Sequence, residues 1–226
     1  MARLKQNDGT SKAAAETLAE AVVETVQDSD LIALRRDQIC EAALELFLKK
    51  GFSATTIRDI CAGSGVNQAS IYDYVANKND ILRRLLNKLW FRTDVLTMTE
   101  RLDQNPQLPL NENLADYFRE TWSTKRKGTL LAYRAVPHLQ SDDRKAMRSH
   151  EQERLILLAD RLRQYANLSA DDRRPEIIAN MIIFLSAFAP MRDWLMDDID
   201  EDLILHTVAG GVAAMLDRIA EQNPES

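Results

Sequence analysis

The stretch at residues 55–82 is TTIRDICAGSGVNQASIYDYVANKNDIL. Its capping residues and apolar spacing predict a short helix, a glycine turn, a second short helix and the start of a third. Thr56 and Asp59 make a capping-box-like pair for the first helix, and Gly65 suits the left-handed backbone of the turn. This order is that of a helix-turn-helix, which presents its second helix to the major groove of DNA. We therefore expect a DNA-binding protein.

The second helix, at residues 67–75, is the candidate recognition helix. Its apolar residues Ile71 and Val75 lie four positions apart, so we expect both to face the core. The outward face is expected to contact base edges or phosphates through Asn67, Gln68, Ala69, Ser70 and Tyr72. Asp73 also points outward, and it either accepts a hydrogen bond from a cytosine amine or repels phosphate.

Phosphate contacts are expected on both sides of this helix. Lys78 begins the third helix, where its ammonium and the free backbone amides can hold one phosphate, and Thr55 or Thr56 can hold another. Simple helix capping and solvation is the alternative for all of these side chains. The complete spacing of the motif favours DNA contact.

Composition favours an all-α protein. The chain has 226 residues, 45% of them hydrophobic, but only seven glycines and six prolines. From residue 30 to residue 92 the formal charge is +3, whereas the whole chain carries −6 and the remainder therefore −9. The electrostatic footprint of nucleic-acid binding belongs to a domain, so this asymmetry suits an anionic partner for the N-terminal part.

We divide the chain into three parts. Residues 1–29 are an N-terminal extension, partly disordered or with one extra helix at 12–27, whose Arg3, Lys5 and Lys12 either follow a DNA backbone or are solvated. Residues 30–80 are the helix-turn-helix domain, and residues 81–226 are a helical ligand-binding and dimerisation domain. Apolar periodicity and its breaks predict helices at about 35–50, 77–99, 112–127, 129–136, 142–167, 174–189 and 201–221.

The cysteines and the apolar segments predict a cytoplasmic protein. Cys40 and Cys61 lie within apolar helical patterns and are expected in the core rather than as oxidant sensors. The first residues lack the apolar segment of a signal peptide. The longest apolar run, at 177–191, is shorter than the ~18 residues of a membrane span, so we expect no membrane contact.

The chain from residue 39 to residue 82 resembles the N-terminal domain of the TetR-like transcriptional regulators. The matching elements are AALELF ending in KKGF, then TTIRDI, GVNQASIYDYV and NKNDIL. The C-terminal two-thirds is similar mainly as an all-helical ligand domain, loosely like the branch that answers to acyl-CoA thioesters. The resemblance implies a homodimeric DNA-binding regulator, usually a repressor, which a small molecule releases from a palindromic operator.

The resemblance also implies roles for single residues. Thr56 matches a threonine that often touches phosphate, Lys78 matches the phosphate-binding lysine, and Tyr72 and Tyr74 match the paired aromatics. The positions that face bases and phosphates are matched by Gln68, Ala69 and Ser70. The chain departs from the family pattern where it has Gly63 for the usual alanine, Val75 for the usual phenylalanine and Gln68 for a frequent lysine.

Small and apolar residues on the last two long helices predict a dimer interface. We expect these helices to pair with their symmetry mates as a four-helix bundle; packing within one protomer is the alternative. The interface candidates are Ile178, Ile182, Leu185, Thr207, Gly210, Gly211 and Ala214.

A ligand cavity needs apolar walls and few polar anchors. The candidates are Tyr117, Trp122, Tyr133, Arg134, Met147, Met181, Phe184, Phe188 and Trp194, although such residues at helical spacing also suit an ordinary core. Arg134 and His138 share a helical face and either anchor a carboxylate or phosphate or are solvated. We expect no cofactor but a small-molecule effector, an acyl-CoA or another hydrophobic ligand.

Other functional classes have less support. The sequence has no Gly-rich phosphate loop, HExxH, GxSxG or CxxC, so we expect neither an enzyme nor a metal site. The spacings of Asp202 with His206, and of His150 with Glu153 or Arg154, are better explained by capping or solvated faces than by metal binding. A helical protein-interaction module on the same fold, without DNA binding, remains the alternative.

Overall fold

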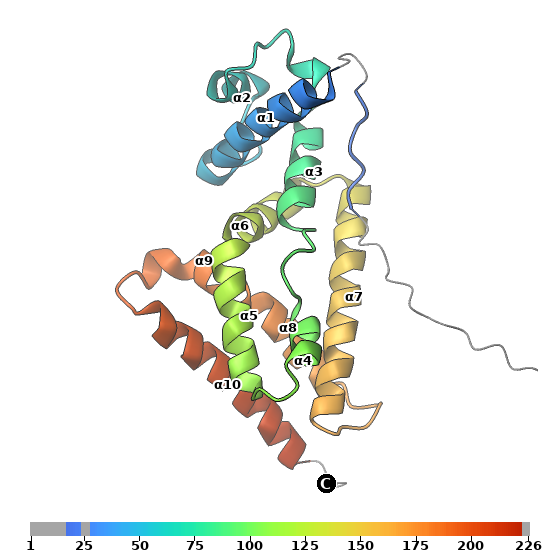
Figure 1. Ribbon diagram of the computed structural model, residues 1–226, viewed down its shortest axis with the longest axis vertical. Coiled ribbons are helices and arrows are strands. Elements are labelled where there is room, and N and C mark those ends of the chain that lie inside the picture. Colours follow the sequence, from blue (N-terminus) through green and yellow to red (C-terminus); the bar gives the residue numbers. More distant parts are fainter. Residues whose placement is uncertain (1–16, 24–27, 223–226) are drawn as a thin grey trace, which may run out of the picture.

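The structure is a computed structural model that describes residues 17–23 and 28–222 (Figure 1). These residues form helices and no strand, which confirms the predicted all-α class. The α-helices are α1 Ser29–Lys50, α2 Ile57–Ser64, α3 Lys78–Leu89, α4 Met98–Gln104, α5 Leu110–Thr124, α6 Arg126–Ala135, α7 Ser141–Tyr165, α8 Arg174–Leu185, α9 Phe188–Arg192 and α10 Glu201–Glu221. The 3₁₀ helices are η1 Ile71–Asp73, η2 Val136–His138 and η3 Asp193–Leu195. Figure 1 shows an elongated molecule with α1 and α2 at one end and α10 at the other.

Local capping sets both ends of α2 and the start of α3 as the sequence predicts, whereas α1 begins at Ser29, capped by Asp28, six residues before the predicted start at 35. Thr56 and Asp59 form the complete capping box of α2, with each side chain accepting from the other residue's backbone N–H. Gly65 ends α2 in the left-handed conformation, with φ of +69°. Asn77 caps α3 by accepting from the backbone N–H of Asp80 at 3.0 Å.

A first hydrophobic core joins α1, α2 and α3 to the C-terminal helices. Its fully buried side chains in the N-terminal part are Ile39, Phe47, Ile60, Ile71, Ile81 and Leu86. Leu131 of α6 and Met147 of α7 belong to the same core. The helix-turn-helix therefore rests directly on α6 and α7, and the predicted division at residue 80 stays a prediction.

Two glycines mark close helix contacts in this first core. A Cβ built on Gly128 of α6 would lie 2.6 Å from the backbone oxygen of Leu89, at the end of α3. A Cβ built on Gly63 of α2 would lie 3.3 Å from the Cβ of Ala42 on α1. The backbone of α6 thus lies against the backbone of α3, and only glycine fits there without displacement.

A second core holds the C-terminal helices together. Its buried side chains come from α4, α5, α7, α8 and α10, and the largest fully buried ones are Phe118, Leu114, Leu162 and Ile182. α5 lies against α10, and α7 lies against α8. This arrangement leaves one face of α8 and one face of α10 uncovered in the protomer.

The predicted long helix at 77–99 is wrong beyond Leu89. The N–H groups of Trp90 and Phe91 both bond to the carbonyl oxygen of Leu86, and the chain then leaves the helix. Phe91 and Val95 are buried, so the apolar pattern continues although the helix does not. A new capping box at Thr97 begins α4. Buried residues in a connecting segment have the same sequence pattern as a helix face, which explains the error.

The predicted helix at 174–189 is also interrupted. α8 ends at Leu185, and α9 begins only at Phe188. The hydroxyl of Ser186 donates to the carbonyl oxygen of Ile183 at 2.6 Å, which is a local alternative to helical hydrogen bonding. The remaining predicted helices of the C-terminal part agree with α5, α6, α7 and α10 to within about three residues.

The described part of the N-terminal extension is not helical. Residues 17–23 form an extended segment, here called the strap, along α3. The predicted helix at 12–27 is therefore wrong for these residues. The rest of that helix, and the proposed arm with Arg3, Lys5 and Lys12, lie outside the described residues.

Candidate functional site

The candidate recognition segment is a turn followed by a single 3₁₀ turn rather than the predicted α-helix at 67–75. The N–H groups of Ser70 and Ile71 both bond to the carbonyl oxygen of Asn67 at 3.0 Å, and η1 follows. The Asn67 side chain accepts from the N–H of Ala69 at 2.9 Å, so it caps this turn. The N–H groups of Ile71 and Val75 make α-type bonds to residues four positions earlier, whereas those of Ser70 and Tyr74 make 3₁₀-type bonds, so the segment is an irregular helical turn.

The two faces of this segment separate as its spacing predicts. Ile71 and Val75 are both fully buried in the first core. On the other side, Gln68 and Ala69 are exposed, and 52% of Tyr72 is accessible to solvent. An aromatic ring and an amide side chain thus protrude together from a buried base, which is the arrangement that base and phosphate contact requires.

Thr55 and Thr56, the two phosphate candidates before α2, have different environments. Thr55 is 1% exposed, and its hydroxyl donates to the carbonyl oxygen of Gly51 at 2.8 Å. Thr55 is therefore a structural residue, which corrects its assignment to DNA contact. Thr56 is exposed, and its hydroxyl bonds to the carboxylate of Asp59 at 2.7 Å. The Lys50 ammonium, 2.7 Å from that carboxylate, together with Thr56 holds the pKa of Asp59 well below its usual range.

Lys78 connects α3 to the loop before α2. Its ammonium donates to the carbonyl oxygens of Phe52 and Thr55, each at 2.8 Å, and lies 4.4 Å from the centre of the Phe52 ring. Burial lowers the pKa of Lys78. An ammonium has three N–H donors, so two are used inside the protein and one remains for a phosphate.

The last three candidates of the segment lie at its edge. Ser70, Asp73 and Tyr74 are each half-buried. Tyr74 packs against the first core, and its carbonyl oxygen accepts from Arg36 Nε at 2.9 Å. Arg36 is a residue that sequence reasoning missed, because nothing in the local pattern of α1 indicates a bond to a residue 38 positions away.

Asp80 forms a buried hub that the sequence also did not reveal. The Asp80 carboxylate accepts from the N–H of Ala76 at 3.0 Å, from the N–H of Ala21 at 2.9 Å and from Arg84 Nε at 3.2 Å. Asp80 is fully buried. The hub therefore joins the end of the recognition segment, the strap and α3.

The strap is fixed to α3 by a second set of bonds. The Asn87 amide accepts from the N–H of Leu18 at 2.8 Å and donates to the carbonyl oxygen of the same residue at 2.9 Å. Arg84 donates to the carbonyl oxygen of Ala21 at 2.7 Å and to Glu20 at 2.6 Å. Leu18 is 3% exposed and belongs to the first core, so the strap is part of the fold of the N-terminal domain.

The predicted ligand residues do not converge on one cavity. Met147 lies in the first core, and Trp122 lies in the second, where its indole N–H donates to the carbonyl oxygen of Leu185 at 3.1 Å. Tyr133, Phe184 and Trp194 are exposed, while Met181 and Phe188 are half-buried. Tyr117 is the predicted residue that lines a cavity among α4, α5, α7 and α8, here called the interior cavity, which opens to solvent beside Leu157, a residue that is 60% exposed. Side chains at helical spacing suit either a core or a pocket, so sequence could not separate them.

Arg134 and His138 do not line the interior cavity; Arg134 instead lines a separate pocket of about 250 Å³ together with Trp194. Arg134 donates to the carbonyl oxygen of Leu48, at the end of α1. His138 stacks on Phe52 with 5.7 Å between ring centres, and its Nδ1 lies 3.3 Å from the hydroxyl of Ser53. Both residues hold the segment after α6 against the helix-turn-helix.

The interior cavity has a volume of about 170 Å³. Its lining residues are Thr97, Met98, Thr99, Glu100, Tyr117, Arg154, Leu157, Leu158 and Ile183. Next to it, Lys125 and Arg154 form a group that we call the cationic pair. Burial, together with the charge of Arg154, lowers the pKa of Lys125 to about 8 and that of His150 to about 4. Burial also raises the pKa of Glu151.

The predicted dimer residues divide between core and surface. Ile178 and Ile182 are buried in the second core and cannot form an interface, which corrects their assignment. Leu185 is half-buried against the same core. Thr207, Gly211 and Ala214 are exposed on α10, and Gly210 is half-buried.

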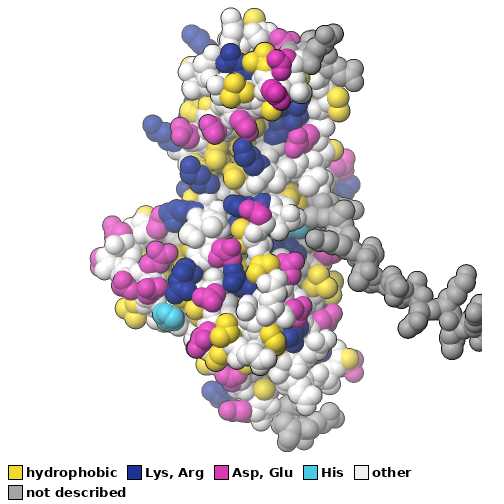
Figure 2. All heavy atoms as spheres, viewed as in Figure 1, with side chains coloured by type: hydrophobic (Ala, Val, Ile, Leu, Met, Phe, Trp, Pro, Cys, Tyr) yellow, Lys and Arg dark blue, Asp and Glu magenta, His cyan; other side chains and the backbone are white. Residues whose placement is uncertain are grey.

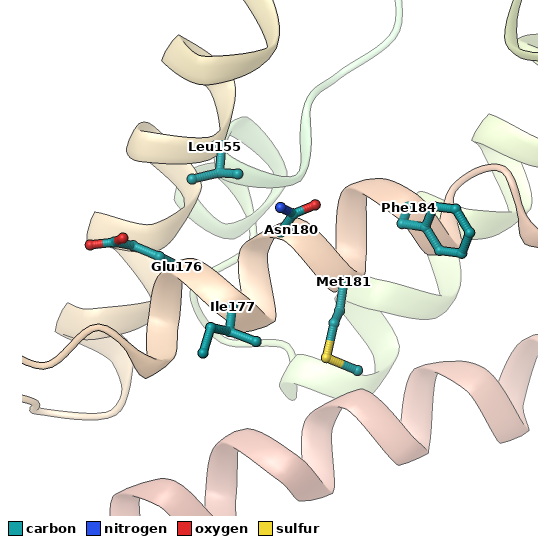
Figure 3. A pocket seen from close by; sticks show the side chains of 6 residues that line it. All are labelled: Leu155, Glu176, Ile177, Asn180, Met181 and Phe184. Atoms are coloured by element: carbon teal, nitrogen blue, oxygen red, sulfur yellow. The ribbon is translucent and has the colours of Figure 1, made fainter. Parts of the chain in front are cut away.

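The uncovered face of α8 carries the residues adjacent to those predicted. Ile177 and Phe184 are 63% and 54% exposed, and Met181 lies between them. Together with Leu155 of α7, Glu176 and Asn180, they line an open groove of about 520 Å³ (Figure 3). Figure 3 shows Ile177 and Met181 pointing from α8 toward α10.

α10 itself is long and apolar enough to cross a membrane by length and composition, and 28% of its apolar window is buried in the protomer. Its exposed apolar residues include Leu203 and Met215. Within the described ranges, no group of three or more His, Cys, Asp or Glu side chains is placed to hold a metal ion. Figure 2 shows acidic side chains gathered over the protruding connection between α9 and α10.

The sequence profile of the bacterial regulatory proteins of the tetR family matches residues 39–85, from within α1 to within α3. The N-terminal domain belongs to the tetR family. This tetR domain contains the capping box of α2, the recognition segment and the Asp80 hub.

One of the similar proteins matches a stretch of this chain longer than the tetR domain. The HTH-type transcriptional regulator HbdR of Aromatoleum sp. (strain CIB) is 31% identical over 139 residues, which are 59% of this chain and 58% of that protein. The HTH-type transcriptional repressor KstR2 of Mycobacterium tuberculosis is 38% identical over 52 residues, which are 23% of this chain and 26% of that protein. In these matches the chain spans less than two thirds of either relative.

The whole fold has counterparts among solved structures. A TetR-family transcriptional regulator from Bordetella parapertussis 12822 superposes with a TM-score of 0.59, over 80% of this chain and 93% of that chain. The two sequences are 21% identical, so the likeness shows the fold alone. The helical C-terminal part is thus of the kind found in tetR-family proteins.

Proposed function

We propose that this chain is a homodimeric transcriptional repressor that binds a palindromic DNA operator and is released from it by a small-molecule effector. The observation that carries the proposal is the recognition segment of a tetR-family domain, in which Ile71 and Val75 are buried while Gln68 and Tyr72 protrude. Such a protein acts in the cytoplasm, where the chromosome of a bacterium lies.

The residues proposed to contact DNA are those whose polar or aromatic groups are exposed. Gln68, Ala69 and Tyr72 enter the major groove, where an amide can pair with base edges and a ring can contact a thymine methyl group or the backbone. Lys78 offers its third N–H to a phosphate, and the exposed Thr56 lies at the start of α2. These phosphate contacts set the register, and Gln68 and Tyr72 supply the preference for sequence.

The homodimer uses the uncovered faces of α8 and α10. Ile177, Met181 and Phe184 on α8 and the stripe with Gly211 on α10 would each pack against the same helices of a second copy. A Cβ built on Gly210 or Gly211 meets no atom within 4 Å in the protomer, so packing inside the protomer does not explain either glycine. The close approach of a helix from a second copy would explain both glycines.

The effector binds in the C-terminal part and shifts the equilibrium away from the DNA-binding state. It must therefore bind the conformation that is released from DNA more tightly than the bound one. The interior cavity among α4, α5, α7 and α8 is the proposed site, since its walls are apolar apart from a few polar groups. A hydrophobic small molecule, with acyl-CoA thioesters as one class to test, fits this proposal.

The first experiment is selection of bound sequences from a random duplex pool by the purified protein, repeated at two salt concentrations. A regulator enriches a palindrome, and its affinity falls with salt because each phosphate contact releases counterions. No enrichment by a folded dimer, after removal of co-purified small molecules, would favour the protein-interaction module instead.

Matched variants then locate the contact. Tyr72→Ala and Gln68→Ala should weaken binding to the selected operator by about tenfold or more, because each removes a groove contact worth about 1–3 kcal/mol. Tyr165→Ala is the control, since Tyr165 is 46% exposed at the far end of α7. Equal affinity of all three variants would contradict the placement of the recognition segment.

A further inference from the structure

The interior cavity has an apolar body and one charged wall. Met98, Tyr117, Leu158 and Ile183 supply the apolar surface, and each of the first three is less than 9% exposed. Arg154 of α7 lines the same cavity and is half-buried. A ligand that fills the cavity therefore contacts both an apolar surface and a guanidinium group.

Arg154 has no carboxylate to neutralise it. Within the part of the chain that the structure describes, its side chain makes no ion pair within 4.0 Å and no hydrogen bond. Two other arginines of the same helix find partners: Arg161 pairs with Asp103 at 2.7 Å and Arg163 pairs with Asp160. Taking a cation out of water without a partner costs free energy, so an unpaired arginine in a cavity wall is the arrangement expected of an anion site.

Lys125 strengthens the positive potential at this wall. Lys125 lies where α5 meets α6, and it interacts electrostatically with Arg154. It too makes no ion pair within 4.0 Å among the described residues. Burial lowers its pKa to about 8, and the two cations of the pair also lower the pKa of His150, to about 4. Two half-buried cations thus lie near each other, and among the described residues neither forms an ion pair.

The nearby acidic groups do not remove this potential. The carboxylate of Glu100 lines the cavity but is bound to Thr97, accepting from its N–H and its hydroxyl at 2.8 Å each. Glu151 lies near both cations, yet burial raises its pKa, which favours its neutral form. Asp94 is bound by Arg92. Among the described residues, none of these three carboxylates forms an ion pair with Arg154 or Lys125.

The volume of the cavity limits the size of the ligand. At about 170 Å³ the cavity is close to an engineered apolar cavity of about 150 Å³ that binds benzene. A single ring or a chain of a few carbons fills such a space, whereas a larger molecule would have to extend from it.

We propose that the interior cavity binds a small apolar carboxylate, with its ring or short chain against Met98, Tyr117 and Leu158 and its carboxylate on Arg154, beside Lys125. This inference rests on the proposed function in one respect, since it takes the cavity as the effector site. It names the chemistry that the site selects: an anionic group of carboxylate size on an apolar body.

Three molecules of almost the same shape test the charge requirement. Benzoate, benzamide and benzamidine carry an anionic, a neutral and a cationic group on the same ring. Thermal unfolding of the full chain, followed by calorimetric titration, gives the binding of each probe through its linkage to stability. We expect benzoate to bind at least about tenfold more tightly than benzamide, and benzamidine not to bind, because only the anion forms a charge-assisted bond.

Two variants assign the effect to a residue. Arg154→Gln should raise the dissociation constant of benzoate by about tenfold or more and leave that of benzamide unchanged. Arg148→Gln is the matched control, since Arg148 is exposed on the same helix. Hexanoate and phenyl phosphate, compared in the same way, distinguish a short chain from a ring and a carboxylate from a phosphate.

The outcomes are separable from those of the DNA experiments, because ligand binding is measured without DNA. The inference is overturned if benzamide or benzamidine binds as tightly as benzoate, if Arg154→Gln binds benzoate like the parent protein, or if no anionic probe binds at millimolar concentration. If phenyl phosphate binds more tightly than benzoate, the inferred preference for a carboxylate is wrong. A protein that selects an operator but ignores every anion refutes this inference alone.

Discussion

The carboxylate of Asp80 and the guanidinium of Arg84 form an ion pair, at 3.2 Å from Oδ2 to Nε, in which Asp80 is fully buried and 10% of the Arg84 side chain is exposed. The same carboxylate also accepts from the backbone N–H groups of Ala21 and Ala76. One side chain therefore determines both where the strap lies and where the recognition segment ends.

Replacing Asp80 should destabilise the tetR domain. Asp80→Ala leaves Arg84 Nε and two backbone N–H groups without their acceptor in the protein interior, so we expect the free energy of unfolding to fall by about 3 kcal/mol. Urea unfolding followed by circular dichroism measures this change. Asp37→Ala is the control, since Asp37 pairs with Lys88 where both side chains are 58% exposed, and its loss should cost less than about 1 kcal/mol. Equal effects would show that the hub contributes no more than a surface pair.

Asn87 should control how often the strap detaches from α3. Asn87→Ala removes both bonds to the backbone of Leu18, so cleavage at Glu20 by a glutamate-specific protease should become about tenfold faster. Asn79→Ala is the matched control on the same helix, where the described residues give the Asn79 side chain no hydrogen-bond partner. Mass spectrometry of the fragments identifies the cleaved bond. An unchanged rate for Asn87→Ala would mean that the burial of Leu18 and the bonds to Asp80 and Arg84 hold the strap without Asn87.

His150 should make the protein sensitive to acid. Burial, with the charges of Arg154 and Lys125, lowers the pKa of His150 to about 4, below the ordinary value of 6.5. Between these two values the unfolded chain binds a proton that the folded protein does not, so stability should fall as the pH is lowered from 6.5 toward 4. In His150→Leu the fall over this range should be shallower, while the exposed His206→Leu should retain the parent profile. The melting temperature measured across this pH range tests the prediction.

A large side chain at Gly211 should prevent dimer formation. A Cβ at this position meets nothing within 4 Å in the protomer, so Gly211→Arg should fold normally. In a homodimer the arginine would enter the contact between the two α10 helices, and we expect sedimentation velocity to show a monomer at micromolar concentration. Asp217→Arg, exposed on the same helix but away from the small-residue stripe, should remain dimeric. A dimeric Gly211→Arg would place the interface elsewhere.

Sequence predicted the features that depend on neighbouring residues. The capping box of Thr56 and Asp59 joins groups only three positions apart, and the left-handed Gly65 is a property of one residue. The burial of Ile71 and Val75 followed from their spacing alone. Each of these features depends on residues that are close together in the chain, so the local sequence is enough to predict it.

The features that sequence missed depend on how distant helices meet. α8 is apolar on more than one face, so its periodicity did not distinguish the buried Ile178 and Ile182 from Ile177 and Met181 on the uncovered face. The sequence around Arg154 does not distinguish it from other arginines on helices. Its apolar neighbours are set by the packing of α4 and α5 against α7. The strap has the composition of a helix, but its N–H groups bond to α3 instead.

At Gly128 the backbones of α6 and α3 are in direct contact. Where α6 meets α3 no side chain lies between the two backbones, so a displacement of α6 cannot be absorbed by a change of rotamer. Lys125 of the cationic pair is three residues before Gly128, and Leu89 ends the helix that begins beside the recognition segment. We therefore expect a displacement of α6 to move α3 directly, so that the cavity end and the DNA-binding end of the molecule shift together.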